Sequence, residues 1–257
     1  MVYNVKCLHY VDGETETRIY SHPVYTGGKK EEEKKKLNTE PDIERSIRNS
    51  QNRTIQSIYS VSKSNHWEWF ITLTLDAKQV NRYDYAECSK KVSKWFKNLK
   101  LRKCPDMKYL IVPELHKDGA YHFHGLLSCC PELQMQFSGH FTKEGEPIYN
   151  ITDYGFGWTT ATEVQNNQAV AKYVTKYITK ELCTSTSGKK RFWCSRNVQK
   201  PIEQLYFLEG AEVELLRYEM QEEHEHFKRV TCDLGLTKRI VEYYQNQCRI
   251  RAAEEIE

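Results

Sequence analysis

The alternation of apolar and polar positions predicts a sheet and a covering helix in the middle of the chain. Between residues 67 and 76, Ile71, Leu73 and Leu75 alternate with polar side chains, which is typical of a half-buried strand. From 82 to 100, apolar residues recur every three or four positions while lysines fill the opposite side, so an amphipathic helix is expected to pack on this sheet. Further strands are expected over 109–115, 121–129 and 158–164.

The two ends of the chain give less regular patterns. Residues 1–26 resemble strands around a turn at Gly13, and the Lys/Glu-rich stretch 27–56 lacks an apolar period, which favours a linker or a solvated helix. One helix is expected over 167–182, and an acidic helix over 213–227. These patterns divide the chain into an N-terminal extension with a charged linker (1–65), a central domain (66–200) and a C-terminal acidic helical extension (201–257).

Composition indicates a soluble chain with uneven charge. Of 257 residues, 39% are hydrophobic and 28% charged, and no apolar run approaches the roughly 20 residues of a membrane span, so a cytoplasmic protein without a membrane partner is expected. Its nine cysteines form no Cys-x-x-Cys pair and no Walker A pattern occurs, which argues against structural zinc and ATP hydrolysis. The net charge of +3 conceals basic blocks at 78–108 and 172–200 and an acidic block at 203–226. If the basic blocks meet in space, they form a groove for a polyanion.

A tight turn in the centre of the chain brings candidate metal ligands together. Lys117-Asp118-Gly119 suits a three-residue hairpin loop, in which the glycine takes the positive φ. That closure places Glu114 opposite His122, and period-two alternation places His124 on the same face. One carboxylate and two imidazoles form a ligand set for a divalent cation that leaves coordination positions open.

Two tyrosines on the helix expected over 167–182 are candidate nucleophiles. Tyr173 and Tyr177 fall between an apolar stripe and a cationic stripe that includes Lys176 and Lys180. A phenol has a pKa near 10 and attacks slowly at neutral pH, so it needs a cation that stabilises the phenolate or polarises the target. The lysines suit the first task and a metal ion the second, with a phosphodiester as the target. Tyr173 lies nearer the lysines and is expected to attack first.

Three segments in this order resemble the HUH endonuclease superfamily, specifically the two-tyrosine rolling-circle replication initiators of plasmids and single-stranded DNA phages. The resemblance spans about residues 67–182, and segment 191–197 also resembles the stretch that follows the tyrosine helix in phage-type members. The three segments are Phe-Ile-Thr-Leu-Thr-Leu-Asp at 70–76, Tyr-His-Phe-His-Gly-Leu-Leu at 121–127 and Tyr-Val-Thr-Lys-Tyr-Ile-Thr-Lys at 173–180.

The resemblance implies an α+β fold of HUH/RRM-like topology, with a central antiparallel sheet of about five strands and flanking helices. It also implies one Mg²⁺ or Mn²⁺ ion as the cofactor, with Glu114, His122 and His124 in the ligand positions. The implied substrate is single-stranded or hairpin origin DNA, which is nicked through a 5′-phosphotyrosine and left with a free 3′-OH that primes synthesis. A separate helicase and the host polymerase are the implied partners.

Other functions stay open at this point. A non-catalytic single-stranded nucleic-acid-binding protein would use aromatic and basic side chains alone, and would leave Glu114 without a purpose. An iron oxygenase would use two histidines and one carboxylate, and would leave the tyrosines and lysines unexplained. A relaxase or transposase would share the nicking chemistry and use it in DNA transfer instead of replication.

Overall fold

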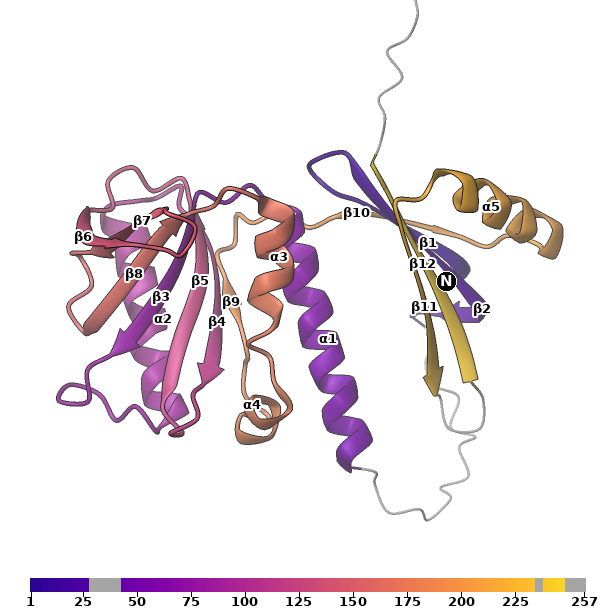
Figure 1. The fold of residues 1–257 in the computed structure, drawn as a ribbon. Coiled ribbons are helices and arrows are strands. Elements are labelled where there is room, and N and C mark those ends of the chain that lie inside the picture. The colour runs from indigo at the N-terminus through magenta and orange to yellow at the C-terminus, as the bar shows by residue number, and fades with distance from the viewer. Residues whose placement is uncertain (28–42, 234–237, 248–257) are drawn as a thin grey trace, which may run out of the picture. The chain divides into compact units, whose positions relative to one another are not determined.

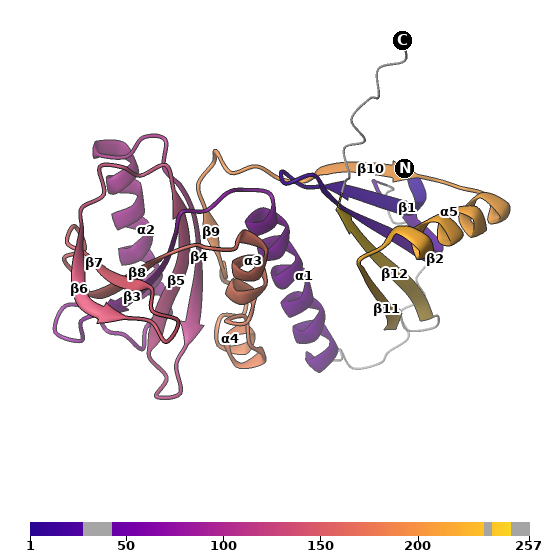
Figure 2. The same cartoon turned by 45° about the horizontal axis from the view of Figure 1, so that its top comes forward.

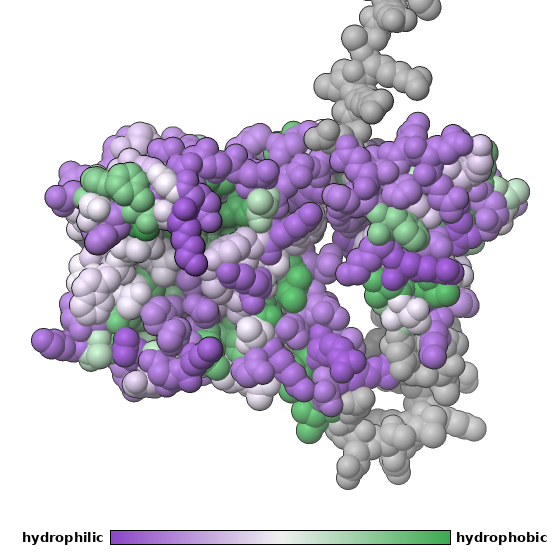
Figure 3. Space-filling view, in the orientation of Figure 1, coloured by the Kyte–Doolittle hydropathy of each residue, from purple (hydrophilic) through white to green (hydrophobic). Residues whose placement is uncertain are grey.

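The computed structural model describes residues 1–27, 43–233 and 238–247 of the chain (Figure 1). The chain divides into two compact units, one formed by 41–200 and the other by 1–40 together with 201–257. The described residues form five helices and two antiparallel sheets, of seven and five strands, so the expected α+β class is confirmed. Hydrophilic residues cover most of the visible surface of both units (Figure 3). None of the described helices is long and apolar enough to cross a membrane.

The unit formed by 41–200 is built on the seven-stranded sheet. The strands expected around 67–76, 109–115, 121–129 and 158–164 are all present. A five-stranded antiparallel sheet occurs in the other unit, whereas the predicted ligands lie on the larger sheet. The larger sheet has the order β6-β7-β8-β3-β5-β4-β9, with β3 (Trp69–Leu75), β4 (Lys108–Leu115), β5 (Tyr121–Ser128), β6 (Met135–Phe141), β7 (Pro147–Ile151), β8 (Gly157–Glu163) and β9 (Trp193–Cys194).

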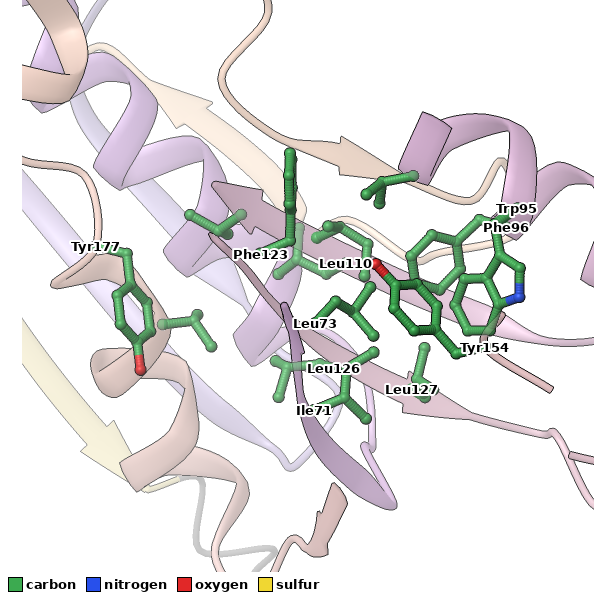
Figure 4. Close-up of a cluster of buried hydrophobic side chains, with 14 of the residues drawn as sticks. Ile71, Leu73, Trp95, Phe96, Leu110, Phe123, Leu126, Leu127, Tyr154 and Tyr177 are labelled. Carbon is green, nitrogen blue, oxygen red and sulfur yellow. The ribbon is translucent and has the colours of Figure 1, made fainter. Parts of the chain in front are cut away.

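Helix α2 (Tyr85–Arg102) covers one face of this sheet, as the apolar period indicated. It begins where the side chain of Asp84 accepts hydrogen bonds from backbone N–H groups of the first turn. Phe96 of α2 stacks on Tyr109 of β4, with 4.7 Å between ring centroids. In Figure 4, Trp95, Phe96 and Tyr154 gather at one end of the buried cluster and Tyr177 lies at the other.

The opposite face carries α3 (Asn167–Thr175) and α4 (Lys180–Ser185), which pack against α1 (Ile43–Lys63). Figures 1 and 2 both show α2 on one side of the sheet and α1 and α3 on the other. The lysines of α2 and those of α3 therefore lie on opposite faces and do not line one groove. The part of the expected linker at 28–42 lies outside the described residues, and 43–56 belongs to α1.

The single helix expected over 167–182 is wrong, because the chain breaks between α3 and α4. Threonine side chains bond to the local backbone on both sides of the break, which competes with continued helix. Thr175 Oγ1 donates to the carbonyl of Lys172 at 2.7 Å, and Thr179 Oγ1 accepts from the N–H of Leu182 at 3.1 Å as the N-cap of α4. The apolar stripe is nevertheless buried as expected, including Val174 and Leu182.

The two ends of the chain form one unit, whereas the sequence pattern treats them as separate extensions. Strands from both ends pair directly, for example Val5 with Tyr206 and Thr17 with Tyr244. The expected acidic helix ends at Glu223, and the residues after it form a strand instead. The sheet order is β10-β1-β2-β12-β11, from β1 (Val2–His9), β2 (Glu14–Tyr25), β10 (Ile202–Tyr206), β11 (His226–Asp233) and β12 (Lys238–Gln247), with α5 (Gly210–Glu223) packed on it.

Candidate metal centre and tyrosine pair

The hairpin between β4 and β5 closes in the predicted register. Gly119 has a φ of 87°, and its N–H donates to the carbonyl of His116 at 2.9 Å. Glu114 pairs with His122 across the ladder. His124 follows two residues later, so the carboxylate and both imidazoles share one face of the sheet.

Threonines of β3 orient both imidazoles. Thr72 Oγ1 lies 3.1 Å from Nδ1 of His124, and Thr74 Oγ1 lies 3.4 Å from Nδ1 of His122. Nε2 of His124 in turn lies 2.8 Å from a carboxylate oxygen of Glu114. Hydrogen bonds to Nδ1 fix the ring orientation and leave Nε2 as the donor atom for a cation, which is the usual arrangement behind metal-binding histidines.

The donor set fits a divalent cation in its chemistry, and its geometry is that of side chains bonded to one another. Among the residues that the structure describes, no three His, Cys, Asp or Glu side chains form a ready metal site. The hydrogen bond with His124 lowers the pKa of Glu114, and burial lowers the pKa of His122. Both shifts favour the forms that bind cations, an ionised carboxylate and a neutral imidazole. Glu114 must release His124 for all three side chains to share one ion.

The two tyrosines lie against this face in different environments. Tyr177, in the turn after α3, is 7% exposed, and its ring stacks on His124 with 3.7 Å between centroids and 6° between planes. Tyr173, on α3, is 44% exposed and meets the ring of Tyr177 edge-on at 5.8 Å. The structure therefore brings both phenols to the histidine pair, one buried and one open to solvent.

Lys176 distinguishes the two phenols electrostatically. Its Nζ lies 3.3 Å from the ring centroid of Tyr173 and 5.2 Å from that of Tyr177. Burial of Tyr173 acts to raise its pKa, but hydrogen bonds with Lys176 and Tyr177 outweigh this and lower it. Burial, reinforced by the hydrogen bond with Tyr173, raises the pKa of Tyr177. Lys180 instead donates to Glu44 of α1 at 2.9 Å.

Phe70 is a site residue that the sequence reasoning did not single out. Its ring stacks on His124 at 5.9 Å and meets Tyr173 edge-on at 5.3 Å between centroids. It thereby joins the metal face to the exposed tyrosine. The available signal was its position two residues before Thr72, since strand alternation places both on one face.

One comparison with known proteins gives a match to this region. Residues 68–182 are similar to the family described as replication-associated protein of the ORF2 type. The matched segment contains all the predicted ligands, tyrosines and lysines, and the similarity is consistent with a Rep-type replication initiator. Neither the curated proteins nor the solved structures include a significant match to the chain.

Proposed function

We propose that the chain is a metal-dependent, site-specific endonuclease and strand transferase of single-stranded DNA that starts and ends rolling-circle replication. The observation that carries the proposal is the packing of Tyr173 and Tyr177 against the face that holds His122, His124 and Glu114. Similarity of residues 68–182 to the replication-associated family supports the same class of function.

Tyr173 is the first nucleophile of the proposed reaction, because its phenol is exposed and its pKa is lowered beside Lys176. Its oxygen bonds to the phosphorus, and the bond from phosphorus to the 3′ oxygen breaks. The phenol gives up one proton, and the leaving 3′ oxygen takes one up as a hydroxyl. A Mg²⁺ or Mn²⁺ ion held by Glu114, His122 and His124 would draw charge from a non-bridging phosphate oxygen.

Tyr177 serves strand transfer in this proposal. While Tyr173 is free, its hydrogen bond and the burial of the ring keep Tyr177 protonated. Once Tyr173 carries the DNA, that phenol is no longer a hydrogen-bond donor to its neighbour, and Tyr177 becomes the remaining acceptor for a second strand. The proposed substrate is single-stranded or hairpin origin DNA in the cytoplasm, with a separate helicase for unwinding and the host polymerase for synthesis.

Covalent capture tests this function. The chain is incubated with a randomised single-stranded DNA library and Mn²⁺, and the products are separated on a denaturing gel. We expect an adduct that chelation abolishes and that is absent from Tyr173→Phe/Tyr177→Phe and from His122→Ala/His124→Ala. An adduct that persists in either double variant contradicts the assigned roles.

The main alternative is a protein that binds single-stranded nucleic acid without cleaving it. The exposed aromatic side chains Phe141 (60%) and Trp158 (65%) favour this alternative, because bases stack on such rings. The same gel separates the two functions, since a pure binder retains DNA in native gels and gives no covalent adduct. A relaxase or transposase would also give the adduct, and the similarity to a replication-associated family favours replication over both.

A further inference from the structure

Trp158 is a large aromatic residue of β8 that no core buries. Its side chain is 65% exposed, whereas Tyr154, four residues earlier, is 5% exposed. Along β8 the buried residues are Thr159 and Ala161, and Thr160 is exposed. Because side chains alternate between the faces of a strand, Trp158 lies on the face opposite to Ala161.

That face is the one that carries the candidate metal centre. Trp158 pairs with Thr74, Thr74 pairs with His122, and His122 pairs with Glu114. The four side chains form a row across β8, β3, β5 and β4. Neighbouring strands lie roughly 4.8 Å apart, so Trp158 stands about 10 Å from His122 along this row.

The backbone under Trp158 is held tightly. A Cβ on Gly157 would lie 2.1 Å from the carbonyl oxygen of Thr74, so only glycine allows β8 to approach β3 this closely. The N–H of Asp76 donates to the carbonyl of Phe156 at 2.7 Å on the other side of this contact. The indole therefore projects from a fixed point, and little backbone ordering is required for a ligand to use it.

We propose that Trp158 is a base-stacking platform that positions single-stranded DNA on the active face of the sheet. The inference rests on the proposed nuclease function and adds a positioning residue to it. A nucleobase suits the indole because every base has a flat face to stack on it. A strand with its phosphate at His122 would place a base about one to three nucleotides away over Trp158, given a rise of about 3.4 Å per stacked nucleotide.

Equilibrium binding of a fluorescent oligothymidine strand in the presence of a chelator tests the platform without cleavage. We expect Trp158→Ala to weaken binding about 10-fold to 100-fold and Trp158→Phe to retain most of the affinity. Trp158→Leu, which is apolar but not aromatic, should behave like the alanine variant. Phe141→Ala is the matched control, because Phe141 is 60% exposed and its ring packs on Phe137 of the edge hairpin. Equal affinity of wild type and Trp158→Ala overturns the inference.

An abasic scan of a captured substrate separates this inference from the nuclease proposal. Base removal at one position near the scissile phosphate should slow adduct formation by wild type at limiting DNA and have no added effect on Trp158→Ala. At saturating DNA the two proteins should form adduct at the same rate, because Trp158 positions the strand and takes no part in bond breaking. If wild type forms adduct and no position shows this loss of sensitivity, the platform is refuted and the nuclease stands. If wild type forms no adduct but binding still depends on Trp158, the nuclease proposal fails and the platform stands.

Discussion

At the scale of single residues, the site depends on which groups share a hydrogen bond. Tyr173 and Tyr177 are the same chemical group, yet one pKa is lowered and the other raised. Lys176 contacts the first ring more closely, and His124 covers the second. The difference assigns them successive roles in the proposed reaction. The expectation from helix rotation that Tyr173 lies nearer a lysine agrees with this geometry, although the helix ends before Tyr177.

Removal of the Lys176 charge should shift the pH dependence of attack. A cation beside Tyr173 favours the phenolate, so its loss raises the pKa of that phenol and moves the rise of the rate to higher pH. We expect Lys176→Met to be slower than wild type at neutral pH and to approach it at alkaline pH. Single-turnover adduct formation across pH measures this. Lys176→Arg keeps the charge and should keep the profile, and a profile unchanged in Lys176→Met would contradict the role.

At the scale of elements, the strands were predictable and the tyrosine segment only partly so. The hairpin register follows from local turn chemistry, which is why the pairing of Glu114 with His122 could be derived from the sequence. The break after α3 follows from side-chain bonds of Thr175 and Thr179, which an apolar periodicity does not contain. The contacts of Thr72 with His124 depend on strands 52 residues apart, and no short-range pattern encodes them.

Gly125 is a sensitive point of the strand that carries the histidines. A Cβ there would lie 2.4 Å from Cδ1 of Ile111, so Gly125→Ala should lower the free energy of unfolding by about 1–3 kcal/mol through overpacking. Ile111→Val removes that methyl group and should cost about 0.5–1.5 kcal/mol by itself. The double variant should lose less than the sum, because the clash is relieved. Urea denaturation measures all three, and strictly additive losses would show that Ile111 does not set the limit.

At the scale of the whole molecule, the functional residues belong to one of the two units. The core of 41–200 includes Ile58, Leu73 and Leu182, whereas the other unit has a separate core around Ile19 and Tyr244. The sequence pattern did not indicate that the two ends of the chain form one unit. That unit depends on pairs such as Val5 with Tyr206, whose separation along the chain exceeds the range of any local periodicity.

A shortened chain of residues 41–200 should fold and form the covalent adduct. All predicted ligands and both tyrosines lie inside it, together with the larger core. We expect cooperative thermal unfolding and an adduct yield close to that of the full chain with the same DNA library. A matched chain with Tyr173→Phe/Tyr177→Phe controls for non-covalent retention. Loss of the adduct from a folded 41–200 would show that the other unit contributes to the reaction.

The stack of Tyr177 on His124 links the loading of an ion to the placement of a nucleophile. Such coupling is reciprocal: whatever factor the cation applies to the position of the phenol, a change in the phenol must apply to the affinity for the cation. Substitution of Tyr177 is then also a perturbation of ion uptake. Occupancy by the metal and readiness for the second cleavage would rise and fall together within a single turnover.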